Sequence, residues 1–126
     1  MTTIFPTLKY DDAHGAIAFL CDALGFERHA VHETDDGKVG HAELRHGDGM
    51  VMIGSRGTEG ELYESGRTTV YVVVEDPDAL HDRAKAAGAE IVAPLTDQDY
   101  GSRDFAAADP EGNVWAFGTY NPTAPQ

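Results

Sequence analysis

His41 and Glu43 are the side chains whose types and spacing best suit acid–base chemistry. They stand two residues apart in the alternating run Val39–His46. Residues two apart on a β-strand share one face, so an imidazole and a carboxylate would lie side by side there. Two ligands do not make a metal site, because a bound divalent ion needs more protein donors. The pattern therefore favours a ligand-binding or acid–base contact, and it also fits a solvated strand face.

The other histidines and the only cysteine do not form a reactive group in the sequence. His14 and His81 fall outside the apolar stripes of two expected helices and should face solvent. His29 and His32 are three residues apart on one expected strand, so they should point to opposite faces. Cys21 lies on an apolar stripe and should be a buried packing residue. We therefore expect no metal ion and no cofactor.

The charge of the chain excludes some partners. Its 126 residues include 22 acidic and 9 basic ones, a formal net charge of −13 that would repel nucleic acid. The acidity fits either a solvated surface, including adaptation to high salt, or a field that attracts cationic small molecules. No apolar run approaches the roughly 20 residues that span a bilayer. The single cysteine and the absence of a signal-peptide pattern at the N-terminus predict a cytoplasmic protein.

The first half of the chain predicts one helix and four strands. Asp11 or Asp12 should cap the helix, whose apolar stripe includes Ala13, Ile17, Leu20, Cys21 and Leu24, and Gly25 should end it. The expected strands are Thr3–Tyr10, Glu27–Glu33, Val39–His46 and Met50–Gly54.

The second half repeats this order after a polar, glycine-rich linker. Asp76-Pro77-Asp78 should open a helix with the stripe Leu80, Ala84 and Ala87, and Gly88 should end it. The turn Asp109–Asn113 between two strand-like runs is a good hairpin signal. The expected strands are Thr68–Glu75, Glu90–Pro94, Arg103–Ala108 and Val114–Thr119.

The two halves match under a shift of 63 residues. This offset separates Gly25 from Gly88 and also Gly49 from Gly112. It predicts an α+β fold of two tandem βαβββ modules within a single domain of residues 1–126. The first module covers residues 3–55, the linker 56–67 and the second module 68–120.

Nearly the whole chain resembles the vicinal oxygen chelate superfamily, which includes glyoxalase I, extradiol dioxygenases and bleomycin-resistance proteins. The matching stretches are DDAHGAIAFLCDALGFE, VVVEDPDALHDRAKAAGAEI, and YGSRDF with DPEGN before the strand VWAF. The last of these is most similar to glyoxalase-like or bleomycin-resistance-like members. The resemblance implies a cup-shaped mixed sheet with the ligand inside it, and a homodimer.

The resemblance also indicates where catalytic members bind a divalent metal. Carried over to this chain, the four positions are Phe5, Ile53, Thr69 and Ala116. None supplies an imidazole nitrogen or a carboxylate oxygen, so we expect no metal at these positions.

Strand alternation predicts which side chains line the cup. Leu44, Val72, Val74, Phe105, Trp115 and Phe117 should face the helices. Tyr100 and Arg103 should lie near the ligand, with Arg103 binding a carboxylate or pairing with Asp104 or Glu111. The predicted ligand-binding residues are Phe5, Thr7, His41, Glu43, Tyr71, Tyr100, Arg103 and Asp104.

The sequence thus predicts a metal-free, dimeric protein that binds a small organic molecule and, if this is a cationic drug, sequesters it. Three alternatives remain open. They are a metal-dependent enzyme of the glyoxalase or dioxygenase type, a metal-free lyase or isomerase that uses Tyr71, His41 or Glu43 as acid and base, and a structural or regulatory dimer whose cup is vestigial.

Overall fold

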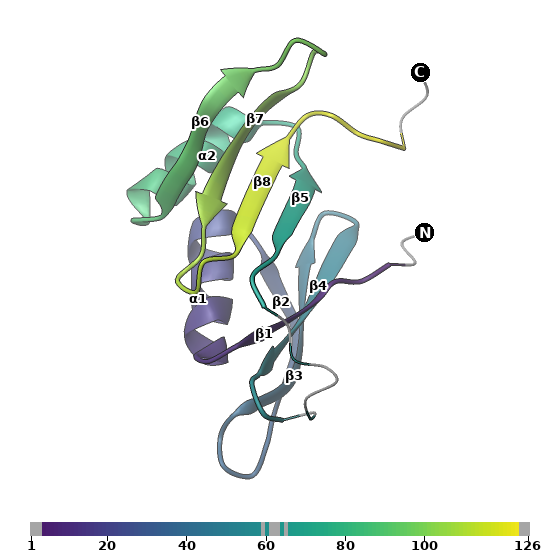
Figure 1. The fold of residues 1–126 in the computed structure, drawn as a ribbon, viewed down its shortest axis with the longest axis vertical. Coiled ribbons are helices and arrows are strands. Elements are labelled where there is room, and N and C mark those ends of the chain that lie inside the picture. Colours follow the sequence, from purple (N-terminus) through teal and green to yellow (C-terminus); the bar gives the residue numbers. More distant parts are fainter. Residues whose placement is uncertain (1–3, 59, 61–63, 65, 124–126) are drawn as a thin grey trace. The chain divides into compact units, whose positions relative to one another are not determined.

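The computed structural model describes residues 4–58, 60, 64 and 66–123 and divides the chain into two compact units, residues 1–66 and 67–126. In its described part, each unit has one helix and one four-stranded sheet (Figure 1). The elements follow one another as strand, helix and three strands in both units. The predicted α+β class and the two βαβββ modules are therefore confirmed.

The first unit is a mixed sheet with the strand order β1-β4-β3-β2. β1 runs parallel to β4, and the other neighbours are antiparallel. Helix α1 joins β1 to β2 and packs on one face of the sheet, so the opposite face carries no helix of this unit. The elements are β1 (Thr7–Tyr10), α1 (Ala13–Leu24), β2 (Glu27–Glu33), β3 (Val39–His46) and β4 (Gly49–Ser55).

Helix α1 begins and ends at the residues expected to cap it. The Asp12 carboxylate accepts a hydrogen bond from the Gly15 N–H at 3.0 Å, and Gly25 adopts a left-handed conformation with φ 81°. Its buried face is formed by Ala13, Ala16, Ile17, Leu20, Ala23 and Leu24. Cys21 is only half-buried, so its prediction as a buried packing residue is wrong. It lies at the margin of this face, beyond the small side chain of Ala16.

The second unit has the corresponding strand order β5-β8-β7-β6. β5 runs parallel to β8, and α2 packs against β6 and β7. The elements are β5 (Thr69–Val73), α2 (Pro77–Ala86), β6 (Glu90–Asp97), β7 (Arg103–Ala108) and β8 (Val114–Gly118). β6 extends beyond its predicted end at Pro94 because this edge strand contains register shifts, where a proline interrupts no regular ladder.

Helix α2 confirms the Asp-Pro-Asp start but not its predicted buried stripe. The Asp76 carboxylate accepts a hydrogen bond from the Ala79 N–H at 3.1 Å, and Pro77 occupies the first turn. The side chain of His81 is only 17% exposed, and its ring meets the Phe105 ring edge-on at 5.3 Å. The prediction that His81 faces solvent is therefore wrong. The stripe passes through Pro77, His81 and Ala84, at i, i+4 and i+7.

The repeat between the units has an offset of 64 residues at the strands that correspond to each other, instead of 63. Leu8 pairs with Ile53 in the first unit, and Val72 pairs with Phe117 in the second. The members of these pairs are each 64 residues apart. The helix ends keep the offset of 63, because α1 is longer than α2.

Gly49 and Gly112 are not equivalent, and that prediction is wrong. Gly49 begins β4 and pairs with His46 across a tight turn, while Gly112 lies inside the longer turn before β8 with φ 87°. A positive φ requires glycine at the second position but not at the first. The common spacing of 63 therefore arose from hairpin loops of different length.

The buried faces of both sheets follow the predicted alternation. Leu44, Phe105, Trp115 and Phe117 are at most 1% exposed, whereas Val72 and Val74 are only half-buried. The predicted linker falls partly on residues 59, 61–63 and 65, which lie outside the described residues, as does Thr3 in the first predicted strand. None of the described helices is long and apolar enough to cross a membrane.

Candidate functional site

The open face of the second sheet brings a phenol and a carboxylate together. Alternation along β5, β7 and β8 places Tyr71, Asp104 and Gly118 on the face opposite to buried Phe105 and Phe117. A methyl group on Gly118 would lie 2.7 Å from the Tyr71 hydroxyl oxygen and 2.8 Å from Asp104 Cβ. Only glycine leaves room for both side chains above β8.

Three tyrosines meet on this face: Tyr71, Tyr100 and Tyr120, here called the tyrosine cluster. The Tyr71 hydroxyl donates a hydrogen bond to the Tyr120 carbonyl at 2.8 Å, and the Tyr120 N–H donates to Ser102 Oγ at 3.2 Å. The rings of Tyr100 and Tyr120 meet edge-on at 6.0 Å. Partial burial raises the pKa of Tyr71 above its usual 10.0, so its hydroxyl stays a neutral donor. The cluster offers exposed aromatic surface, because Tyr100 is 67% exposed.

Asp104 supplies a carboxylate beside the tyrosine cluster. Gln98 Nε2 donates a hydrogen bond to Asp104 Oδ1 at 2.9 Å, which fixes the side chain. Within the described part of the chain, no cationic side chain pairs with Asp104. A carboxylate accepts several hydrogen bonds, so Asp104 retains capacity for a ligand.

Arg103 lies elsewhere, and both of the acidic neighbours proposed for it are wrong. Instead of Asp104 or Glu111, it contacts Asp78 and Asp97. Its Nε and Nη2 donate to the two oxygens of Asp78 at 2.7 and 2.9 Å, and Nη1 donates to Asp97 at 3.2 Å. These hydrogen bonds lower the pKa of Asp78 and raise that of Arg103. Alternation along β7 directs Arg103 to the helix-covered face, away from Asp104.

The open face of the first sheet contains the predicted histidine–carboxylate pair. His41 Nε2 lies 2.9 Å from Glu43 Oε2, and the hydrogen bond from His41 is the main cause that lowers the pKa of Glu43. Because an ionised carboxylate only accepts, Nε2 carries the proton and Nδ1 of His41 is left as an acceptor. The His32 ring stacks on His41 with centroids 6.4 Å apart.

A β-bulge adds His29 to the same face. The bulge inserts His29 as an extra residue between two ladder pairs of β2 and β3, so that its Nε2 lies 3.8 Å from Glu43 Oε1. Arg45 Nη2 lies 2.9 Å from His29 Nδ1. The prediction that His29 and His32 face opposite sides of the strand is wrong, because it assumed an unbroken alternation. We call His29, His32, His41, Glu43 and Arg45 the histidine cluster.

The remaining predicted ligand residues lie at the start of the first sheet. Phe5 precedes β1 and is 42% exposed, and Thr7 is the exposed first residue of β1. The structure thus groups the predicted residues by unit. Phe5, Thr7, His41 and Glu43 belong to the first, and Tyr71, Tyr100 and Asp104 to the open face of the second.

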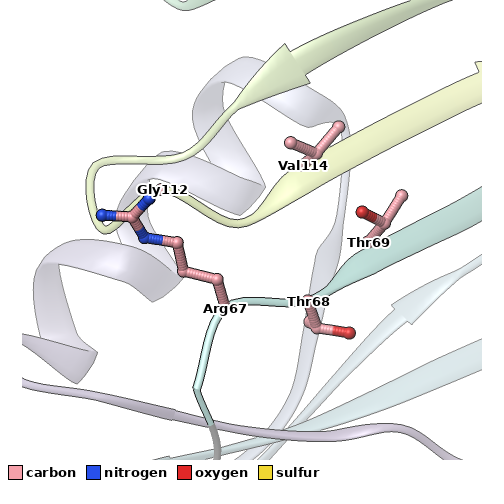
Figure 2. Close-up of a pocket in the computed structure, with 5 residues that line it drawn as sticks. All are labelled: Arg67, Thr68, Thr69, Gly112 and Val114. Carbon is pink, nitrogen blue, oxygen red and sulfur yellow. The ribbon is translucent and has the colours of Figure 1, made fainter.

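Figure 2 shows a small open pocket at the start of β5, lined by Arg67, Thr68, Thr69, Gly112 and Val114. The Arg67 side chain extends beside Gly112, where an added Cβ would lie 3.2 Å from Arg67 Nε. The sequence did not indicate Arg67, because it falls in the predicted linker. The pocket is shallow and widely open, so it offers less to a ligand than the tyrosine cluster.

Comparison with known proteins identifies the family. Residues 6–117 match the family described as the glyoxalase/bleomycin resistance protein/dioxygenase superfamily. The chain belongs to this superfamily. It is similar to the bleomycin resistance protein of Geobacillus stearothermophilus, with 30% identity over 134 residues that cover 93% of this chain and 96% of that protein. An uncharacterized protein of Mycobacterium bovis is 34% identical over 121 residues, covering 90% and 80%.

Solved structures of the superfamily share the fold. TioX from Micromonospora sp. ML1 aligns with a TM-score of 0.83 and 31% identity, covering 96% of this chain and 100% of that one. The lactoylglutathione lyase of Agrobacterium tumefaciens aligns with a TM-score of 0.71 and 20% identity, covering 94% and 93%. The second likeness supports the fold alone.

The ladder corrects one of the four metal positions expected from the superfamily. Ile53 is 1% exposed and lies on the buried face of β4. Met52 takes its place on the open face, since Met52 pairs with Thr7 as Ala116 pairs with Tyr71. The error follows from the assumed equivalence of the two glycine turns.

The residues at these positions do not fit a catalytic divalent metal. Phe5 and Ala116 have no donor atom, Met52 offers a soft thioether, and Thr69 has a neutral hydroxyl. Among the described residues, no group of three histidine, cysteine, aspartate or glutamate side chains could hold a metal ion. No chemistry through a metal follows from this site.

Sequence reasoning missed several residues of the two clusters. Tyr120 directly follows the last strand, and its aromatic type next to Tyr100 is a signal that could have been used. Arg45 and His29 meet through a bulge, which has no sequence signal here. Ser102 acts as a structural acceptor and is 4% exposed.

Proposed function

We propose that this protein binds a small organic cation at the tyrosine cluster, without a metal ion. The observation that supports the proposal is the position of Tyr71 and Asp104 above Gly118, with the rings of Tyr100 and Tyr120 beside them. Aromatic faces attract cations through their quadrupoles, and the carboxylate adds a direct charge. The small residues Ala116 and Gly118 form the floor on which a ligand would lie.

The charge of the whole chain supports a cationic ligand. A net charge of −13 raises the local concentration of small cations and speeds their association. Binding through this field weakens as salt screens it, with a screening length of about 8 Å at physiological ionic strength. An anionic metabolite would meet the opposite field.

The related bleomycin resistance protein suggests what such binding achieves. A protein that holds a toxic cation removes it from its target by binding alone. Sequestration needs no catalytic residue, which agrees with the unsuitable donors at the metal positions.

Calorimetric titration with bleomycin, and with a panel of other cationic antibiotics, 2-oxo acids and catechols, tests this function. Asp104→Asn should weaken the binding of a cation by roughly tenfold, since it removes the charge and keeps the shape. Tyr100→Leu should weaken it by about 0.5–2 kcal/mol, and Tyr100→Phe much less.

Asp82→Asn is the matched control. It makes the same change of charge on α2, where Asp82 is 82% exposed. A field effect alone would give both aspartate variants the same small loss. Equal losses, or a protein that binds none of the cations, would contradict the proposed site.

His41 and Glu43 support a second candidate, a metal-free lyase or isomerase. The Glu43 carboxylate orients His41 and leaves Nδ1 as a proton acceptor. Incubating 2-oxo acids with the protein in D₂O and following C–H signals by NMR would detect proton abstraction. Exchange that is lost in Glu43→Gln would favour this enzyme, and no exchange would remove it.

A further inference from the structure

We infer that Arg45 forms an acid-gated binding site for an oxyanion, such as the carboxylate or phosphate group of a small molecule. The site lies on the open face of the first sheet, in the histidine cluster. It stands apart from the proposed function, because it concerns the other unit and a ligand of opposite charge.

At neutral pH, His29 occupies the guanidinium of Arg45. Arg45 Nη2 lies 2.9 Å from His29 Nδ1, and a guanidinium has only donors, so Nδ1 is the acceptor. An imidazole that accepts at Nδ1 is neutral and carries its proton on Nε2. That nitrogen faces Glu43 Oε1 at 3.8 Å, where a donor belongs. The contacts therefore define one tautomer of His29.

Acid must break the contact between Arg45 and His29. Imidazoles gain a proton between about pH 5 and pH 8, and the proton of His29 would enter at Nδ1. Two N–H groups then face each other, both on cations. His41 responds differently, because its added proton also enters at Nδ1 while Nε2–H continues to donate to Glu43. Acid thus releases Arg45 and leaves the His41–Glu43 pair in place.

The groups around Arg45 favour an external anion in acid. β4 contributes only Met50 and Met52 opposite Arg45 and Glu43, so the charged and titratable groups come from β2 and β3. These groups are Glu27, His29, His32, His41 and Glu43. In acid three of the five become cations, while Glu43 is already engaged by His41. Glu27, the ladder partner of Arg45, is the internal competitor, and one carboxylate leaves several of the five guanidinium donors available.

An oxyanion fits the released pair. The planar fork of arginine matches two oxygens of a carboxylate or phosphate, and protonated His29 adds a second charge within the same reach. Arg45 is exposed, so a ligand meets no covering side chain.

Sulfate titration tests the site, since sulfate remains a dianion from about pH 5 to pH 8 while imidazoles titrate. Binding is measured by NMR shifts of the Arg45 and His29 side-chain nitrogens at constant ionic strength. The wild-type protein should bind sulfate roughly tenfold more tightly at about pH 5.5 than at about pH 8. Glu27→Gln should tighten binding at both values.

Two variants decide the mechanism. His29→Asn keeps an acceptor for Arg45 but does not titrate, so it should abolish the gain in acid, whereas Arg45→Gln should abolish binding. His14→Asn, an exposed histidine of the same unit on α1, should leave the pH dependence unchanged. Equal sulfate affinity of the wild-type protein at both pH values would overturn the inference. So would a gain in acid that persists in His29→Asn, and circular dichroism confirms that each variant is folded.

Discussion

Trp115 donates its indole N–H to Asp109 Oδ2 at 3.0 Å, which ties the last strand to the turn that precedes it. The other oxygen of Asp109 accepts hydrogen bonds from the backbone N–H groups of Glu111 and Asn113, both at 3.0 Å. Trp115 is fully buried and Asp109 is 5% exposed. The turn and the core beneath it thus form one unit.

Replacing Trp115 should therefore cost stability in two separable parts. Trp115→Ala should lower the free energy of unfolding by about 3–5 kcal/mol, as large-to-small core changes do. Trp115→Phe keeps most of the ring but leaves Asp109 without its indole donor, which should cost about 1–3 kcal/mol. Urea unfolding of both variants checks this. A stable Trp115→Ala that loses only ligand binding would move Trp115 to the binding face.

Gly118→Ala should damage the proposed binding site more than the fold. The added methyl group would lie 2.7 Å from the Tyr71 hydroxyl oxygen and 2.8 Å from Asp104 Cβ. Tyr71 can swing away, but Asp104 Cβ cannot, so overpacking should cost about 1–3 kcal/mol. Cation affinity, measured by calorimetry, should fall with it. Gly66→Ala is the control, because no atom lies within 4 Å of its added methyl; equal effects of both changes would argue against the crowding.

Local chemistry made much of this fold predictable from the sequence. Asp12, Asp76 and Gly25 cap their helices as their residue types require, and buried Phe105 and Phe117 follow the alternation of strands. These features depend on neighbours within a few residues. The repeated order of elements then led to the superfamily.

What failed depends on irregular backbone or distant contacts. The bulge at His29 reversed the face of a side chain, and unequal hairpin loops shifted Ile53 out of the open face. Arg103 found Asp78, 25 residues away, instead of its neighbours. Single-residue shifts exchange the two faces of a strand, so a candidate site built on alternation is sensitive to each of them.

The Asp78–Arg103 pair should make stability depend on pH below the usual range of aspartate. Hydrogen bonding to Arg103 lowers the pKa of Asp78 below 3.8 in the folded state. The stabilisation is therefore complete above 3.8 and is lost as the pH falls through the lower folded value. The melting temperature of Asp78→Asn should lie below that of the wild-type protein at neutral pH, and the difference should shrink in strong acid. In an Arg103→Gln background the same change should have little effect.

We expect the chain to form a homodimer, as the resemblance to its superfamily implies. The described exposed apolar side chains include Tyr71 and Val73 on the open face of β5, and such surface tends to mark an interface. Sedimentation at micromolar concentration should give about twice the chain mass of 13.5 kDa. A monomer at these concentrations would contradict the prediction, and Val73→Lys should favour the monomer if this face takes part.

The protein should retain no divalent metal at the positions used by catalytic members of its superfamily. The argument rests on four residues that agree: Phe5 and Ala116 lack donors, the Met52 thioether is soft, and the Thr69 hydroxyl is neutral. With no carboxylate or imidazole among them, nothing offsets the cost of dehydrating the ion. Purified, tag-free protein is loaded with Zn²⁺, Ni²⁺, Mn²⁺ or Fe²⁺, desalted and analysed for bound metal. Near-stoichiometric retention that survives changes of His29, His41 and Glu43 would place a metal at the superfamily positions and refute the prediction, while retention lost with those changes would place it in the histidine cluster.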